Sequence, residues 1–323
     1  MVPNPTRRAY GVLLAVLLLG VCGPAPAQET IRLIFPFAAG GSGDALARIL
    51  ADGLQKATGT PTIVDNRSGA QGRIGVVAVK QAPPDGKTLL LTPIAPLAVY
   101  QHVYKNLAYD PIADFQPVSQ IATFDFAIAV GPMAPVTSVK DLVAWVKAHP
   151  DKGSYGTPAA GTLPHFFAVS FGKAAGIDLR HVGYRGSAAA LTDLLAGQIP
   201  IMMTTTSDLL EQHKAGRIRV LATSDAARSP FLSDVPTFKE AGYDITGVGW
   251  YGAFAPAGTP RETVDKLSKI LAQTVAQPDV KERMLGFGLQ PTGTDADTFA
   301  AIQKRDSALW EPAVKSSGYT PEQ

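Results

Sequence analysis

Apolar residues follow two alternating patterns along this chain. Short, nearly continuous apolar runs predict buried β-strands at residues 31–35, 62–64, 88–91, 126–130, 154–156, 199–203, 220–222 and 250–254. Between these runs, apolar residues recur at three- and four-residue steps, which predicts amphipathic helices. The first helix carries Leu46, Ile49, Leu50 and Leu54 and ends at Gly59, and later helices are predicted at residues 138–148, 187–196, 260–276 and 295–316. This alternation indicates an α/β fold with parallel-rich sheets flanked by helices.

Residues 1–27 differ from the rest of the chain and predict a cleavable signal peptide. Arg7 and Arg8 precede an apolar run over residues 9–21, and Ala25-Pro26-Ala27 fits a cleavage site. Export to the periplasm is therefore expected. Cys22 is the single cysteine and falls within this segment, so the mature chain would have no thiol and no disulfide. Lipid attachment at Cys22 is an alternative, although the bulky residue before it is unusual for such a site.

The mature chain is electrically balanced. Loss of Arg7 and Arg8 takes the 29 basic residues to 27, which equals the 27 acidic residues. A nucleic-acid partner would need a basic surface, and none is indicated. With 46% hydrophobic and 17% charged residues, the chain has the composition of a globular protein. Its length suits two lobes of ordinary domain size.

Two loops between a strand and a helix are candidate ligand sites, because open α/β sheets bind ligands at such loops. The first spans residues 37–44 and is rich in glycine, and the helix after it offers free N–H groups that hold an anion. Ser42 or Asp44 could instead simply cap that helix. Leu46 breaks the dinucleotide fingerprint, and no Gly-Lys-Ser/Thr follows, so a P-loop is excluded.

The second candidate loop spans residues 157–165. Thr157 and Thr162 offer hydroxyl groups there, and His165 stands at the start of the next helix, where it could equally be a structural or capping histidine. Arg185 follows a further short strand and could grip a carboxylate through two parallel hydrogen bonds. A solvated or ion-paired surface arginine is the alternative.

Taken in order, these loops and several other segments resemble the substrate-binding proteins of tripartite tricarboxylate transporters, the Bug family. The resemblance covers nearly the whole mature chain. The matching stretches are residues 36–44, 65–75, 82–90, 155–157 with Gly161, Thr162 and His165, 184–187, 191–197, 215–224 and 256–260.

The resemblance implies a two-lobed, type II-like periplasmic binding protein fold with a hinge and a ligand cleft between the lobes. The first lobe would comprise residues 28–127 and 253–323, and the second residues 128–252. Residue by residue, the resemblance assigns ligand contacts to Phe37, Ala39, Gly40, Ser42, Asp44, Thr157, Ala159, Gly161, Thr162, His165, Arg185 and Gly186.

Two positions depart from the family pattern. The family often has an acidic residue after the strand at residues 199–203, where this chain has Thr204, Thr205 and Thr206 in an expected loop facing the cleft. Thr204 and Thr205 therefore join the expected ligand contacts, and an amino-acid ligand is disfavoured because its ammonium would lack an acid. Arg185 replaces a common lysine and favours planar carboxylates. An aromatic or a di- or tricarboxylic acid is the expected ligand.

The expected function is capture of a small carboxylate by cleft closure and its delivery to a tripartite membrane transporter. No cofactor or metal is expected, and a monomer is the default. Two alternatives remain: a ligand-sensing partner of a membrane receptor, and a secreted enzyme. The enzyme is disfavoured because no two histidines are spaced four apart and no Gly-x-Ser-x-Gly motif occurs, although Asp44 or His165 could in principle act in acid–base catalysis.

Overall fold

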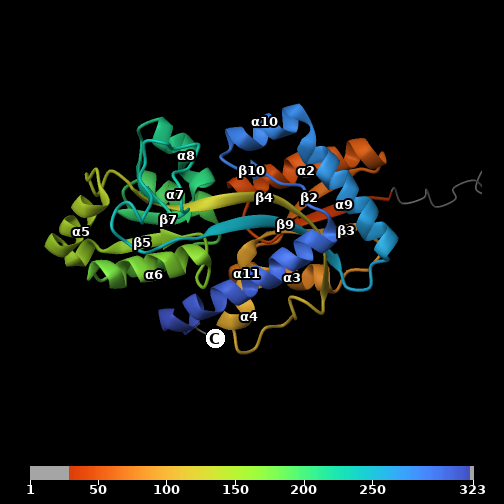
Figure 1. Cartoon of the computed structure of the whole chain (residues 1–323), viewed down its shortest axis with the longest axis horizontal. Helices are drawn as coiled ribbons and strands as arrows, with labels where there is room; N and C mark the ends of the chain where they lie inside the picture. The colour runs from red at the N-terminus through yellow and green to blue at the C-terminus, as the bar shows by residue number, and fades with distance from the viewer. Residues whose placement is uncertain (1–28, 321–323) are drawn as a thin grey trace, which may run out of the picture.

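The computed structural model describes residues 29–320, so the expected signal peptide lies outside the described residues. Figure 1 shows two lobes side by side, connected by the long strands β4 and β9. The first lobe contains the beginning and end of the described chain, and the second contains its middle. Within residues 29–320 no helix has both the length and the apolar composition needed to cross a membrane.

Ten strands form one sheet, in the order β2-β1-β3-β9-β4-β7-β5-β6, with β10 and β8 also paired to β4. Their bounds are β1 Ile31–Phe35, β2 Thr62–Asn66, β3 Thr88–Pro93, β4 Phe115–Val130, β5 Ser154–Thr157, β6 Arg180–Gly183, β7 Ile201–Thr205, β8 Arg219–Thr223, β9 Val248–Pro256 and β10 Gln290–Pro291.

Helices cover the sheet in both lobes (Figure 1). Those of the first lobe are α2 Ser42–Thr58, η1 Ala70–Gly72, α3 Arg73–Lys80, η2 Ala95–Val99, α4 Tyr100–Val103, α9 Arg261–Ala276, α10 Pro278–Gly286 and α11 Ala296–Ser317. Those of the second lobe are α5 Val139–Ala148, η3 Pro150–Lys152, α6 Leu163–Ala175, α7 Ser187–Leu195 and α8 Thr206–Lys214.

The α/β fold with two helix-flanked lobes is confirmed, but the sheet is mixed. The pairs β1–β2, β1–β3, β5–β6 and β5–β7 are parallel, whereas the central strands β4 and β9 run antiparallel to their neighbours. Strand β4 pairs with β9 as far as Asp125 and then, from Phe126, with β7. The two lobes are therefore joined at the middle of one continuous strand.

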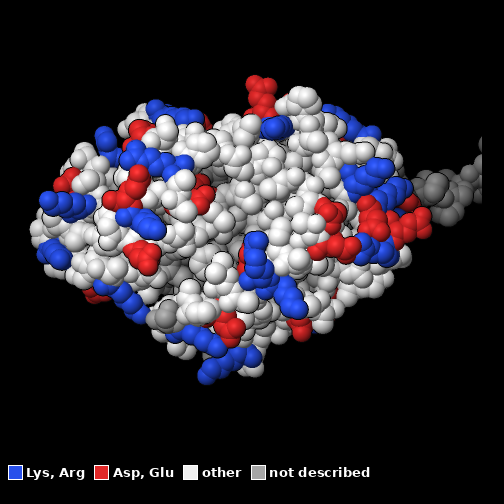
Figure 2. All heavy atoms as spheres, viewed as in Figure 1, with Lys and Arg blue, Asp and Glu red and all other residues white. Residues whose placement is uncertain are grey.

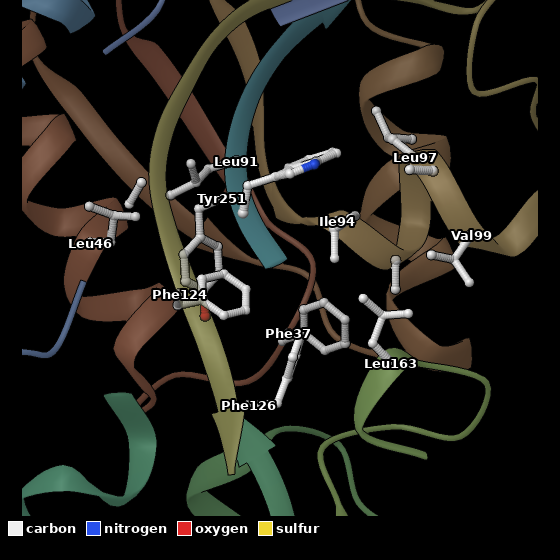
Figure 3. Packing of buried hydrophobic residues seen from close by; sticks show 14 of the residues in the cluster. Phe37, Leu46, Leu91, Ile94, Leu97, Val99, Phe124, Phe126, Leu163 and Tyr251 are labelled. Atoms are coloured by element: carbon white, nitrogen blue, oxygen red, sulfur yellow. The ribbon is translucent and has the colours of Figure 1, made fainter. Parts of the chain in front are cut away.

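One large apolar cluster extends from the first lobe into the second, and a smaller one lies beneath α7 and α8. In the large cluster, Phe37 and Leu163 point toward each other from different lobes, beside Ile94 (Figure 3). The last helix also spans the lobe boundary, since the ring of Trp310 on α11 lies 5.5 Å from that of Phe167 on α6. On the surface, acidic and basic side chains are intermixed over the face shown in Figure 2.

Candidate functional site

Four helices begin at the boundary between the lobes. The N-cap residues are Gly41 for α2, Thr162 for α6, Gly186 for α7 and Thr205 for α8, and none makes a side-chain capping hydrogen bond. First-turn N–H groups have no partner within their own helix, and each N-terminus carries a partial positive charge. The boundary is therefore suited to an anion that accepts hydrogen bonds from both lobes.

Ser42 and Asp208 link the two lobes directly. Oδ1 of Asp208 accepts hydrogen bonds from the backbone N–H of Ser42 at 2.9 Å and from its hydroxyl at 2.8 Å. Oδ2 accepts from the hydroxyls of Thr204 and Thr205, each at 2.9 Å. The hydroxyl of Ser207 adds a bond to that of Ser42 at 3.0 Å. The negative charge of Asp208 thus holds the start of α2 against the start of α8.

A second contact joins the loop after β1 to the loop before α7. The N–H of Ala38 donates to the carbonyl oxygen of Arg185 at 3.2 Å. Two glycines allow this approach. Gly186 has a φ of 143° and lies against Ala38, and a Cβ on Gly41 would lie only 2.5 Å from Oγ of Ser187. These glycines let the backbones of the two lobes come together.

Three cavities lie along the boundary. The aromatic cavity, of about 70 Å³, is lined by Phe35, Phe37, Pro93, Ile94, Ala95, Phe124, Phe126, Pro158, Thr162, Leu163, Pro164, Ser187, Thr205, Asp208 and Tyr251. The Arg185 cavity, of about 290 Å³, shares Phe37 and Pro158 with it and adds Gly69, Ala70, Gln71, Gly72, Ala159, Ala160, Gly183, Tyr184 and Arg185.

The outer cavity, of about 490 Å³, lies on the other side of the Ser42–Asp208 link. It is lined by Gly40, Gly41, Ser42, Ala45, Ser187, Ala188, Leu191, Ser207, Asp208, Leu210, Glu211, Gln212, Lys214, Gly286 and Phe287. Ser187 and Asp208 line both this cavity and the aromatic one. The three cavities are therefore neighbours along the lobe boundary, each with walls from both lobes, and together they are called the cleft here.

Half of the sequence-predicted site residues line this cleft. They are Phe37, Gly40, Ser42, Ala159, Thr162, Arg185 and Thr205. Arg185 is exposed, and its guanidinium makes no hydrogen bond or ion pair within residues 29–320. A planar cation that has no protein partner is available to bind a carboxylate.

The other half line none of the three cavities. Asp44 is buried and accepts hydrogen bonds from the Gly40 N–H and the Asn66 amide, so it fixes the loop after β1. Thr204 is fully buried in β7 and bonds Asp208. The other predicted site residues outside the cavity linings are Ala39, Thr157, Gly161, His165 and Gly186.

His165 belongs to a buried cluster that shapes the loop before α6. Its Nδ1 accepts the N–H of Gly161 at 3.1 Å, and its ring stacks on that of His181 with centroids 4.0 Å apart. His181 in turn bonds the hydroxyl of Thr157 at 2.7 Å. Burial lowers the pKa of His165 to about 4 and, together with the neighbouring imidazole, that of His181 to about 3. Both rings are neutral at ordinary pH.

The expected loop at residues 204–206 is wrong. β7 continues through Thr205, and α8 starts at Thr206, because the hydroxyls of both Thr204 and Thr205 bond the side chain of Asp208 one turn later. The cleft consequently does contain a carboxylate, supplied from inside α8. The signal in the sequence was Ser207-Asp208 following three threonines, a typical beginning of a helix with an acid in its first turn.

The aromatic lining was also missed. Phe35, Phe124, Phe126 and Tyr251 come from the strands β1, β4 and β9. Phe35, Phe126 and Tyr251 lie in runs that predict only buried strands, and Phe124 lies outside every predicted strand. Phe124 and Tyr251 lie ring to ring with centroids 4.7 Å apart, beside Phe37 (Figure 3). The side chains of a strand that face a cavity are determined by how the strands pair in the sheet, and the sequence of one strand does not show that pairing.

Residues 29–320 contain no group of three or more His, Cys, Asp or Glu side chains that could hold a metal ion. What the cleft offers is one unpaired guanidinium, hydroxyl groups, helix N-termini and an aromatic wall. This combination suits reversible binding of a small organic anion.

Comparison with known proteins agrees with this geometry. The model of the tripartite tricarboxylate transporter family receptor matches residues 46–319. A UPF0065 protein of Bordetella bronchiseptica is 34% identical over 94% of each chain. The structure of the periplasmic binding protein BugD, 32% identical, superimposes with a TM-score of 0.86 over 91% of this chain and 99% of BugD. An R. palustris protein solved with adipate, also 32% identical, gives 0.87 over 92% and 100%. The chain belongs to the tripartite tricarboxylate transporter receptor family.

Proposed function

We propose that this protein is a periplasmic receptor that binds a small carboxylate between its lobes and delivers it to a tripartite tricarboxylate-type membrane transporter. The observation that carries the proposal is the unpaired guanidinium of Arg185, which lines a cleft where four helices begin. The adipate in the R. palustris relative is a ligand of the same chemical kind. Binding, and not catalysis, is the role that these groups support.

Arg185 and the first-turn amides would share the carboxylate. A guanidinium donates two parallel hydrogen bonds to a carboxylate, and helix N-termini stabilise the same charge. The hydroxyl of Ser187, which lines two of the cavities, would add a further donor. The hydroxyls of Ser42, Thr162 and Thr205 line the same cavities, but each already donates its proton within the protein. Because the donors are divided between the lobes, the ligand favours the closed state through contacts that the open state lacks.

We propose that residues 28–127 with 253–323, and residues 128–252, move as the two lobes. The change of β4 partners between Asp125 and Phe126 supports a hinge there. The Ser42–Asp208 bonds and the Ala38–Arg185 bond would break on opening, since each joins one lobe to the other. Release of the ligand to a transporter would use that opening.

Thermal unfolding in the presence of single acids tests the proposal. A ligand at a hundred times its Kd raises the free energy of unfolding by about 2.7 kcal/mol. For a chain of this size each kcal/mol raises the Tm by about 2–4 °C or less. The purified protein would be unfolded and refolded to remove any bound ligand, and then screened against aromatic, di- and tricarboxylic acids and amino acids.

The variant Arg185→Gln is expected to abolish the shift given by the best acid without lowering the Tm of the free protein. Arg217→Gln is a matched control, because Arg217 is also an exposed arginine of the second lobe but lies outside the cleft. A refolded protein whose Tm responds to no acid would overturn the proposal, as would turnover of a bound acid into a product.

A further inference from the structure

Five aromatic rings form the inner end of the cleft. Phe35, Phe37, Phe124, Phe126 and Tyr251 all line the aromatic cavity, and each is less than a tenth exposed. They form a connected chain of ring contacts, with centroids between 4.7 and 6.4 Å apart. Pro93, Pro158, Pro164, Ile94 and Leu163 complete an almost wholly apolar wall. Aromatic rings favour another flat ring as a partner, in offset or edge-to-face contact.

No cation lines this cavity. Its single charged residue is Asp208, whose two oxygens already accept four hydrogen bonds from Ser42, Thr204 and Thr205. A ligand carboxylate placed at this end would lose its water and lie beside a like charge without a compensating cation, which is strongly unfavourable. An ammonium would find the carboxylate of Asp208 already occupied.

The carboxylate of the ligand has a better position close by. Phe37 and Pro158 line both the aromatic cavity and the Arg185 cavity, so the two cavities adjoin each other at these side chains. One water molecule needs about 10–15 Å³ of such a cavity, so its 70 Å³ has room for roughly one six-membered ring.

We infer that the ligand is a small monocarboxylic acid with one flat, apolar ring, whose ring enters the aromatic cavity while its carboxylate meets Arg185 at the edge. This inference rests on the proposed receptor function and narrows it, because it separates this chain from its relative solved with adipate, a dicarboxylate. Two features distinguish the ligand: the absence of a second charge and the presence of a ring.

Titration calorimetry on the refolded protein tests both features. The probes are benzoate, cyclohexanecarboxylate, adipate and citrate, used in turn at one pH and salt concentration. Benzoate is expected to bind about tenfold or more tightly than adipate, since burying an unpaired charge in an apolar cavity is costly. Cyclohexanecarboxylate is expected to rank between them, because it keeps the single charge but loses the flat ring.

The variant Phe37→Leu is expected to weaken benzoate more than cyclohexanecarboxylate, because it replaces a ring contact with an aliphatic one. Phe254→Leu is the matched control: Phe254 is a buried ring of the same sheet that lines none of the three cavities. If Phe37→Leu does not fold, the ranking of the four acids on the unaltered protein still decides the matter. Tighter binding of adipate or citrate than of benzoate overturns the inference and leaves the receptor function standing. Absence of binding by all four acids also overturns the inference, and the wider thermal screen then decides whether the receptor function stands.

Discussion

Ser42 and Asp208 are 166 positions apart in the sequence and joined by two hydrogen bonds to one carboxylate oxygen. Ser42 is the first residue of α2 in the first lobe, and Asp208 lies in the first turn of α8 in the second. The bonds connect two helix N-termini, both of which favour a negative charge. Asp208 therefore stabilises the closed arrangement as a fixed anion would, next to the place proposed for the ligand.

Replacement of Asp208 by alanine is expected to weaken both the fold and ligand binding. Ser42, Thr204 and Thr205 would lose their shared acceptor, and each buried donor left unsatisfied costs about 1–3 kcal/mol. Calorimetric unfolding and ligand titration measure the two effects. Asp178→Ala is the control, since Asp178 is an exposed acid of the second lobe that lines none of the three cavities. Unchanged affinity in Asp208→Ala would show that the link plays no part in closure.

Gly41→Ala is expected to oppose closure while leaving each lobe intact. A Cβ at Gly41 would lie 2.5 Å from Oγ of Ser187 in the other lobe, yet the φ of −91° at Gly41 suits alanine. Ligand affinity should therefore fall severalfold with little change in the Tm of the free protein.

Ser187→Ala removes the obstructing hydroxyl, so the double variant Gly41→Ala/Ser187→Ala should recover part of the affinity lost in Gly41→Ala. Gly286→Ala serves as the control on the outer cavity, because a Cβ there meets nothing within 4 Å. A double variant no better than the single one would show that the clash is not what limits closure.

The predicted elements were largely correct where local pattern and tertiary structure agree. The strand predicted at residues 126–130 is the end of β4, which begins at Phe115. Residues 115–125 include Gln116, Ser119 and Gln120, whose polarity hid the strand, and their pairing with β9 holds them in it. Helix α8 was missed for a similar reason, since its sequence is mostly polar and its buried positions Leu209 and Leu210 are few.

The residues that line the cleft were predictable where they lie on loops and unpredictable where they lie on strand faces. The glycine-containing segments before α2 and α7 predict that helices begin there. The aromatic cavity arises only when β1, β4 and β9 bring Phe35, Phe124 and Tyr251 together, which no local spacing encodes. Asp208 likewise gains its role from Ser42, a residue of the other lobe.

Asp125 is expected to make the protein less stable as the pH rises from about 4 to 6. This side chain lies at the change of β4 partners, and burial raises its pKa to about 6. Oδ2 has no hydrogen-bond partner within residues 29–320. Between the unfolded and folded pKa values the folded state holds the extra proton, so stability falls with rising pH, by about 3 kcal/mol in total.

Asp125→Asn removes that charge and is expected to raise the Tm at pH 7. The gain should shrink as the pH approaches 4, where the carboxyl group of Asp125 is itself neutral in the fold. Asp244→Asn is a control for general loss of negative charge, because Asp244 is exposed and is not among the groups that shift the pKa of Asp125. An equal Tm difference at every pH would contradict the assignment of the titration to Asp125.

His165 and His181 are expected to change the stability of the protein with pH in the opposite direction to Asp125, over an overlapping pH range. Their pKa values, about 4 and about 3, lie below the ordinary value of 6.5, so the unfolded state binds the extra protons as the pH falls. The contribution of the two rings to the free energy of unfolding is complete above pH 6.5 and is lost progressively toward pH 4, at about 1.4 kcal/mol per pH unit for each ring.

Asp125 offsets part of this loss of stability in acid. Asp125→Asn should therefore make the loss steeper, and His181→Asn should make it shallower. Proton NMR titration of the imidazole signals gives the direct measurement, in which the rings of His165 and His181 are expected to stay neutral at pH 5. If these two rings titrate near 6.5, the stacked pair does not hold its rings neutral, and the acid sensitivity must come from other groups.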